Sequence, residues 1–332
     1  MLIKDKYTPK YFNEYIINKN IINTYKNLGV KPLYNILING SHGTGKYTLA
    51  KSILCEIYGE SIYNLKKNSL NLKNKNNNKT INFYSSIHHV EIKLNKYSFN
   101  DKTSIIKLIK TLCNSSNILN EYNIILIRNA DNLIKHNFKI LKNIIEYHKN
   151  TRFILTSNNI YFMNEINSFF NIISLPCIQK NELHDLLKNI SIKEKIKYNE
   201  QEINEIIRNS DNNLKKSLLY FENSYTNGEY KSYKNPIFYE IDKLVKKIEM
   251  KDINLFLDIR KQLYFLTSCN IEHNFILKKI IEYFSKSSKY STNIKLNIIK
   301  SAPNHNFKSI KSYRSLIHLE SFIFNLINII NL

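Results

Sequence analysis

Short apolar runs alternate with helical patterns over the first half of the chain. Residues 35–39, 124–127 and 153–155 form brief runs rich in Ile and Leu, which is typical of strands buried on both faces. The first run is followed by a helical pattern over residues 46–58, and four residues between the other two runs lie on one helical face: Leu141, Ile144, Ile145 and His148. Strands that alternate with helices predict a parallel sheet covered on both sides, so we expect an α/β domain over residues 1–175.

A polar stretch over residues 64–79 interrupts this pattern. It is rich in Asn and Lys, with Asn76, Asn77 and Asn78 at its centre. We expect a low-complexity insertion or a long loop that interrupts the α/β domain without ending it.

Beyond Pro176 the strand patterns cease. Three short helices are expected over residues 182–190, 200–208 and 212–223, with Asp211 or Asn212 as the N-cap of the third. These helices predict a small helical lid over residues 176–234.

Two longer amphipathic stripes predict an all-α domain over residues 235–332. Apolar residues recur there at spacings of three and four: Phe256, Ile259, Leu263 and Leu266, then Leu316, Leu319, Ile323, Leu326 and Ile330. The stripes fit two arrangements equally well, a bundle packed within the domain or a surface packed against equivalent helices of neighbouring subunits.

The composition narrows the class of protein. With 332 residues, 43% of them hydrophobic, the chain has room for about two domains with their own cores, which excludes global disorder. Only 6 Gly and 5 Pro, and no apolar window of membrane-spanning length, exclude collagen-like, linker-dominated and membrane-spanning classes. The start has no apolar region of signal-peptide length, so we expect an intracellular protein. The cysteines form no C-x-x-C pair and are interpreted as buried small apolar residues: Cys55, Cys113, Cys177 and Cys269.

The charge is strongly positive. Lys and Arg number 49 against 27 Asp and Glu, which gives a net charge of +22. Such a balance draws a chain towards phosphate-rich partners, and nucleic acid is the obvious candidate. A competing explanation is an AT-rich coding sequence, because Lys, Asn, Ile and Tyr are abundant throughout.

A phosphate-binding motif follows the first predicted strand. Gly40-Ser41-His42-Gly43-Thr44-Gly45-Lys46 fulfils the pattern G-x-x-x-x-G-K between a strand and a helix. The glycines let the backbone curl around phosphate oxygens, N–H groups at the helix start point at the anion, and the lysine places a positive charge near the outer phosphates. The competing explanation is an incidental Gly-rich turn, but three of the six glycines lie here, so nucleotide binding is the best-supported function.

The residues for magnesium and hydrolysis are altered. The position after the lysine carries Tyr47 instead of Ser or Thr, and Thr48 is one place late, which turns its hydroxyl by about 100° around the helix. Thr48 is the candidate Mg²⁺ ligand, and it would hold the metal poorly or through water. After the second strand, where a P-loop ATPase has an Asp and often a Glu, the chain has Arg128 and Asn129. Asp131 is interpreted as a helix-start or surface acid.

Further motifs resemble, in the right order, the small subunits of the replication factor C clamp loader, an assembly of AAA+ ATPases. Lys6-Tyr7-Thr8-Pro9 is similar to an N-terminal box of the family, residues 151–158 to the sensor-one strand, and residues 210–222 to the sensor-two helix of the lid. Residues 260–270 and 317–322 resemble the collar, so the resemblance extends over nearly the whole chain. It implies an AAA+ sheet domain, a helical lid and a helical collar for oligomerisation.

The motif and the resemblance together imply a bound ATP or ADP. Asn158 would face the terminal phosphate, and Lys215 stands where the family has Arg. The residues expected to contact the nucleotide are Tyr7, Pro9, Gly40, Ser41, His42, Gly43, Thr44, Gly45, Lys46, Tyr47, Thr48, Asn158 and Lys215.

One paralogue resembles the chain best, the small subunit whose motif reads Gly-Lys-Lys-Thr, so that its hydroxyl also lies one place late. Its acidic pair is likewise altered, and residues 85–92 resemble it too. This resemblance implies nucleotide binding with little or no hydrolysis.

The chain departs from the family at the arginine finger. Small subunits carry Ser-Arg-Cys, whose Arg reaches the neighbour's nucleotide, but this chain has Ser168-Phe169-Phe170. An arginine finger contributes roughly 10³ to 10⁵ in rate and a general base roughly 10² to 10⁴. We therefore expect negligible intrinsic ATPase activity, assign no catalytic residue, and regard the neighbour's site as doubtful unless another basic residue substitutes.

The favoured function is a nucleotide-binding, largely non-hydrolysing structural subunit of a clamp loader. The resemblance implies a hetero-pentamer with other loader subunits, a sliding clamp and primed double-stranded DNA as partners, with no membrane. Lys102, before the helix expected over residues 105–112, would contact a DNA phosphate, although a solvated lysine is the competing explanation. The nucleus of a eukaryote, or a viral replication site in a host cell, is the expected location. Two alternatives stay open, an active stand-alone P-loop ATPase or kinase and a basic nucleic-acid-binding protein with a vestigial P-loop.

Overall fold

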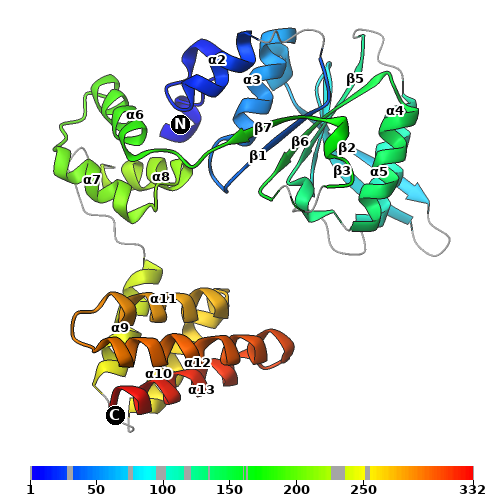
Figure 1. The fold of residues 1–332 in the computed structure, drawn as a ribbon. Coiled ribbons are helices and arrows are strands. Elements are labelled where there is room, and N and C mark those ends of the chain that lie inside the picture. Colours follow the sequence, from blue (N-terminus) through cyan, green and yellow to red (C-terminus); the bar gives the residue numbers. More distant parts are fainter. Residues whose placement is uncertain are drawn as a thin grey trace. The chain divides into compact units, whose positions relative to one another are not determined.

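The chain divides into two units, Met1–Tyr233 and Lys234–Leu332, which have separate hydrophobic cores. Figure 1 shows the fold of each unit in the computed structural model. The structure describes residues 2–27, 33–73, 78–94, 102–115, 121–133, 135–159, 161, 164–225, 236–250 and 255–331.

A seven-stranded sheet forms the centre of the first unit, with the strand order β2-β3-β4-β5-β6-β1-β7. The strands are β1 (Ile36–Gly40), β2 (Lys66–Lys73), β3 (Asn78–Ser85), β4 (His89–Lys93), β5 (Asn123–Arg128), β6 (Thr151–Ser157) and β7 (Asn171–Leu175). The pairs from β4 to β7 are parallel, and β1 lies between β6 and β7, with Ile36 opposite Ile154 and Asn171. The predicted α/β fold with a parallel P-loop sheet is confirmed.

Helices cover both faces of this sheet (Figure 1). Those on one face are α2 (Lys19–Asn27) and α3 (Lys46–Tyr58), and those on the other are α4 (Lys102–Asn114) and α5 (Lys135–Tyr147). Alternate residues of a strand face opposite sides. In β5, accordingly, Ile124 and Leu126 belong to the core under α3, while Ile125 and Ile127 belong to the core under α4 and α5.

For the polar stretch over residues 64–79 an insertion or a long loop was expected, and its described part is not a long loop. It contains β2 and the start of β3, which pair antiparallel with Leu70 opposite Ile81. Leu70, Ile81 and Phe83 pack on the core under α4, and these few apolar residues suffice for a strand pair at the edge of a sheet. The surrounding Asn and Lys obscured the alternation in the sequence.

Three helices of the first unit form a separate lid core: α6 (Lys180–Lys193), α7 (Glu200–Asn209) and α8 (Leu214–Ser224). Asn213 caps α8, accepting a hydrogen bond from the backbone N of Lys216 at 3.2 Å. The cap predicted at Asp211 or Asn212 is therefore wrong by one or two positions. Both residues have positive φ and form the turn before the cap.

Short helical elements complete the first unit. They are α1 (Ile3–Lys6), η1 (Phe12–Glu14), η2 (Glu60–Tyr63), η5 (Ala130–Asn132) and η7 (Asn167–Phe169).

The described part of the second unit is helical: α9 (Pro236–Glu249), α10 (Phe256–Ser268), α11 (His273–Lys286), α12 (Thr292–Lys311) and α13 (Ser315–Asn331). Both apolar stripes pack into its core, except Phe256, whose ring lies edge-on against Phe324. A bundle within the unit thus accounts for the stripes. Arg260 of α10 and Glu320 of α13 form a two-pronged ion pair, with Nε–Oε1 at 2.8 Å and Nη2–Oε2 at 2.9 Å.

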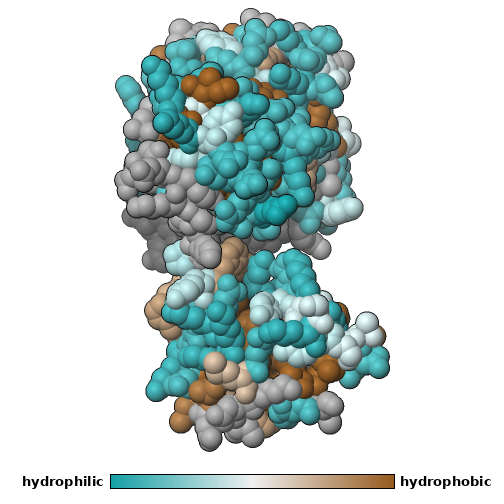
Figure 2. Space-filling view, turned by 90° about the vertical axis from the view of Figure 1, so that its left-hand side faces the viewer, coloured by the Kyte–Doolittle hydropathy of each residue, from teal (hydrophilic) through white to brown (hydrophobic). Residues whose placement is uncertain are grey.

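Two features of the surface bear on the expectations. The face in Figure 2 is mostly hydrophilic, with hydrophobic side chains exposed in small separate groups. Within the described ranges, no helix is both long and apolar enough to cross a membrane. Cys55 and Cys113 are buried as predicted, but Cys177 and Cys269 are exposed because they lie where β7 and α10 end.

Candidate nucleotide-binding site

Residues 40–46 connect β1 to α3 in a tight loop whose glycines are needed for its shape. Gly43 and Gly45 have φ of 85° and 92°, a conformation that costs other residues more. A side chain at Gly43 would collide with Asn213, and a Cβ at Gly40 would lie 2.7 Å from the carbonyl oxygen of Leu175. The loop therefore has the backbone that the sequence motif predicts.

Lys46 lies inside this loop. Its Nζ donates hydrogen bonds to the carbonyl oxygens of Gly40 at 2.8 Å and Ser41 at 2.6 Å. Burial lowers the pKa of Lys46, and the charge of Asp131 opposes that shift. The Thr44 hydroxyl donates to the Ser41 carbonyl at 2.9 Å, which fixes the loop further. A cation is thus already held where the outer phosphates of a nucleotide would lie.

The two positions that normally supply magnesium ligands contact each other. The guanidinium carbon of Arg128, the last residue of β5, lies 3.5 Å from the centroid of the Tyr47 ring. The Tyr47 hydroxyl donates to Glu91 Oε2 at 2.8 Å, and Thr48 follows on α3, half-buried. Within the described residues no cluster of three or more His, Cys, Asp or Glu side chains could hold a metal. The residues present do not fit a magnesium ion.

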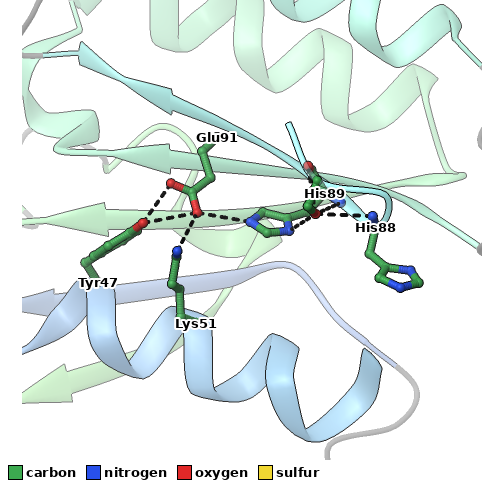
Figure 3. A network of polar contacts seen from close by, with 6 residues as sticks. Tyr47, Lys51, His88, His89 and Glu91 are labelled. Carbon is green, nitrogen blue, oxygen red and sulfur yellow. Dashed lines mark hydrogen bonds and ion pairs between the residues drawn. The ribbon is translucent and has the colours of Figure 1, made fainter. Parts of the chain in front are cut away.

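Tyr47 also belongs to a buried polar network that the sequence analysis did not predict (Figure 3). Glu91 of β4 is 3% exposed, and its Oε1 lies 3.4 Å from Lys51 Nζ and 3.1 Å from His89 Nε2. Burial alone would raise the pKa of Glu91, but the hydrogen bonds from His89 and Tyr47 and the charge of Lys51 hold it below its ordinary value. Burial likewise lowers the pKa of Lys51, against the pull of Glu91. The spacing of two between His89 and Glu91, which puts both on one face of a strand, was the available signal.

The expected sensor-one residue meets the acid after β5. Nδ2 of Asn158, exposed at the end of β6, donates to Asp131 Oδ2 at 3.1 Å. Asp131 lies in the first turn of the 3-10 helix η5, as one interpretation expected, but it is half-buried and its charge acts on Lys46 rather than lying free on the surface. Asn129 has a left-handed backbone, with φ of 55°, and its N–H donates to Thr156 Oγ1 at 3.1 Å. Asn129, the residue at the general-base position, thus stabilises a turn after β5.

The lid contacts the loop through Asn213. Its Nδ2 donates to the carbonyl oxygen of His42 at 2.7 Å. Lys215, the expected sensor-two residue, is exposed in the first turn of α8. The structure therefore brings α8 to the phosphate-binding loop, but through a residue that was not predicted.

The N-terminal box joins the lid to α3. The Tyr7 hydroxyl donates to Glu194 at the end of α6, and burial followed by this bond raises the pKa of Tyr7 to about 12. The carbonyl oxygen of Pro9 accepts a hydrogen bond of 3.3 Å from Ser52 Oγ on α3.

A cavity of about 620 Å³ lies beside these residues. It is lined by the segment from Ile16 to Ile21, by Pro176 and Cys177, and by α6. Cys177 Sγ lies 3.6 Å from Ser41 Oγ, so the cavity reaches the phosphate-binding loop. Pockets of roughly 300 to 1,000 Å³ accommodate small ligands, so a base and ribose would fit here.

Two other positions were expected to contact DNA or a neighbouring subunit's nucleotide. Phe169, at the place of the arginine finger, packs partly buried on the core under α4 and α5 next to buried Phe170. Lys102 is the first residue of α4, and its side chain lies outside what the structure describes, as do Asn100 and Asp101.

Comparisons with known proteins agree with these motifs, although no protein-family model matches the chain. The chain is 28% identical to replication factor C subunit 5 of Saccharomyces cerevisiae, covering 96% of both chains. It is 24% identical to subunit 5 of Schizosaccharomyces pombe, over 97% of this chain and 95% of that protein. It is also 24% identical to a protein of Acanthamoeba polyphaga mimivirus described as a replication factor C small subunit, over 97% and 90%.

Among solved structures, the RuvB Holliday junction branch migration motor of Thermotoga maritima aligns with a TM-score of 0.47 and 13% identity. This match covers 82% of the chain and 85% of that structure. The sequence relatives, in contrast, match nearly the whole chain. The chain is thus similar, over nearly its whole length, to small subunits of the replication factor C clamp loader.

Proposed function

We propose that the chain is a nucleotide-binding, largely non-hydrolysing subunit of a clamp loader that places a sliding clamp on primed double-stranded DNA. One observation carries the proposal. A well-formed phosphate-binding loop lies beside a β5 end at which Arg128 and Asn129 stand where a hydrolysing P-loop enzyme has its acids.

Nucleotide binding is supported by the loop and its surroundings. Lys46 and the N-terminus of α3 offer positive charge to the phosphates of ATP or ADP. The cavity beside Cys177 has room for the base and ribose. Asn158 directly follows β6 and Lys215 lies on α8, the two elements that would approach the terminal phosphate.

Weak hydrolysis follows from what the altered residues do instead. Asn129 cannot act as a general base, and the loss of such a base costs roughly 10² to 10⁴ in rate. Phe169 packs partly buried against the core and offers a neighbour no charge. The resemblance to the paralogue with the Gly-Lys-Lys-Thr motif supports the same conclusion.

The partners are proposed from the relatives. The relatives are named as subunits of replication factor C, which is a complex of several chains. The helical second unit would accordingly form part of a collar with other subunits in a hetero-pentamer. The net charge of +22 and Lys102 on α4 would favour the binding of DNA. The site of action would be where DNA is replicated, which is the nucleus in a eukaryote.

Binding and turnover of ATP by the purified full chain test the proposal. We expect ATP and ADP to bind without sustained hydrolysis, and Lys46→Ala to abolish binding. Lys139→Ala, an exposed lysine on the opposite face of the sheet, is the matched control and should bind normally. Rapid ATP turnover by the chain alone would favour a stand-alone ATPase or kinase. Salt-sensitive DNA binding that Lys46→Ala leaves intact, without nucleotide binding, would favour a vestigial P-loop on a nucleic-acid-binding protein.

Purification of the chain with its partners from its source tests the complex. Mass spectrometry should recover related subunits that retain the Gly-Lys-Thr, Asp-Glu and Ser-Arg-Cys motifs. Recovery of the chain alone would contradict the proposed assembly.

A further inference from the structure

The stacked pair of Tyr47 and Arg128 occupies the two positions from which P-loop proteins hold magnesium. In those proteins a hydroxyl after the P-loop lysine and an acid after the neighbouring strand bind the metal. We infer that the Arg128 guanidinium takes the place of the metal ion, so that this chain binds its nucleotide without a divalent cation. The inference rests on the proposed nucleotide binding and identifies the positive charge that serves it.

Tyr47 is held at two points and cannot offer its hydroxyl to a metal beside the loop. The hydroxyl donates to Glu91 on β4, 2.8 Å from Oε2 and 3.1 Å from Oε1. The Arg128 guanidinium covers the ring face at 3.5 Å. A swing of Tyr47 towards the phosphates would break both contacts, and one of them is a hydrogen bond to a buried charge, worth more than a neutral bond.

The Arg128 guanidinium is not paired with Glu91, the carboxylate of the buried network. Glu91 bonds to Tyr47, Lys51 and His89. Among the described residues, no side chain or carbonyl makes a hydrogen bond to the Arg128 guanidinium. Stacking on a ring uses the flat face of a guanidinium and leaves its N–H donors, which lie in the plane, available. Planar donors of this kind bind phosphate oxygens in pairs.

The surroundings disfavour a hard divalent cation. Magnesium prefers carboxylate and water oxygens in an octahedron. Here Lys46 and Arg128 are both positive, and the acid that acts on Lys46 is Asp131, whose Oδ2 already accepts from Asn158. Thr48 cannot replace the missing ligands alone, because its hydroxyl is turned by about 100° from the usual position.

Nucleotide affinity measured with and without metal tests the inference. Titration calorimetry with ADP and ATP would be run on the full chain in excess EDTA and in excess MgCl₂. We expect dissociation constants that agree within about threefold between the two conditions, a difference well under the roughly tenfold that a lost charged contact produces. Binding that needs magnesium would overturn the inference and leave the proposed function intact. Failure to bind under both conditions would overturn the proposed function itself.

Variants locate the effect at Arg128. In EDTA, Arg128→Gln should weaken binding by about ten- to a hundredfold, as expected for a lost hydrogen bond to a charged group. Arg128→Lys, which keeps the charge but not the planar fork, should lose less. Arg208→Gln on the lid, at an exposed arginine, is the matched control and should bind like the wild type. Circular dichroism and thermal unfolding would verify that each variant is folded.

A double variant provides the converse test. Tyr47→Thr with Arg128→Asp restores the usual ligand types, and its binding should become dependent on magnesium. Arg128→Gln that binds as tightly as the wild type in EDTA would overturn the role of Arg128, as would a double variant that stays indifferent to magnesium while still binding.

Discussion

The side-chain amide of Asn213 donates a 2.7 Å hydrogen bond to the carbonyl oxygen of His42, so one residue joins the lid to the phosphate-binding loop. The same side chain accepts from the backbone N of Lys216 and caps α8. Because both bonds come from one amide, a nucleotide that reshapes the loop also acts on the start of α8. Under the proposed function, binding of a nucleotide would therefore be coupled to the lid through the N-cap of this helix.

Substitutions at Asn213 separate its two bonds. Asn213→Ala removes both and should lower the free energy of unfolding by about 1 kcal/mol, the usual cost of a lost N-cap, and weaken ADP binding. Asn213→Asp keeps the cap but cannot donate to His42, so it should retain stability and still weaken ADP binding. Asn199→Ala, at the N-cap of α7, should cost similar stability without changing affinity. Denaturant unfolding and calorimetry measure these outcomes, and equal affinities in all variants would contradict the coupling.

Nucleotide binding should protect Cys177 from alkylation. Its thiol is exposed, lines the cavity and lies 3.6 Å from Ser41 Oγ of the phosphate-binding loop. Cys269 is exposed in the second unit and should react at the same rate with or without ATP. Peptide mapping after timed treatment with a maleimide gives both rates in one sample. Slower modification of both thiols, or of neither, would contradict the placement of the nucleotide.

Removal of the Glu91 charge should destabilise the first unit. Glu91→Gln leaves Lys51 buried without its counter-ion, which costs about 3 to 5 kcal/mol for a buried pair. Adding Lys51→Met to this variant should recover part of the loss. Glu146→Gln in the exposed pair with Lys142 should cost less than about 1 kcal/mol. Urea unfolding at neutral pH would show the difference, and equal losses from the two Glu variants would contradict the burial argument.

The Glu91 carboxylate should also make the free energy of unfolding depend on pH in the acidic range. A lowered folded pKa means that Glu91 contributes fully above its unfolded pKa of about 4.3, and the contribution disappears as the pH falls through the folded value. The free energy of unfolding of the wild type should therefore fall more steeply below this pH than that of Glu91→Gln. Parallel pH profiles for the two proteins would contradict the assignment.

The second unit should lose stability without affecting nucleotide binding. Leu263 is fully buried in the core of that unit, so Leu263→Ala should lower its free energy of unfolding by about 2 to 5 kcal/mol. Leu257→Ala, on the same helix but 65% exposed, should have little effect. ADP affinity should be unchanged in both variants, because the loop belongs to the other unit. A large loss of affinity in Leu263→Ala would contradict the separation of the two cores.

The strongest sequence predictions concerned elements whose own residues specify them. The apolar run before Gly40 and the glycines of the motif fixed β1, the loop and α3, because close backbone approach and positive φ are local demands. β4 was missed because His89 and Glu91 interrupt its apolar pattern. Glu91 is buried with partners on α3, and His89 is buried with Ser86 and Glu91 as partners. The β2–β3 pair was missed because polar residues suit a strand with one side towards water.

The contacts within the site could not be read from the sequence in the same way. The absence of acids at Arg128 and Asn129 was visible, but the stacking of Arg128 on Tyr47 joins residues more than 80 positions apart. Asn213 was overlooked because it follows Asp211 and Asn212, which are equally good N-cap residues by type. Its contact with the distant carbonyl of His42 has no signal in the sequence. The local motifs thus predicted the loop and its altered neighbours, whereas contacts between distant residues, such as those of Asn213 and Glu91, became visible only in the fold.

The edge strand β2 has a consequence for the tendency of the chain to aggregate. The outer side of such a strand presents unpaired backbone groups, which attract strands of other molecules and seed aggregation. Lys66 and Lys67 are exposed along this edge, and paired positive charges repel a second copy of the same strand. These lysines therefore disfavour aggregation of the chain with other copies of itself through the edge strand.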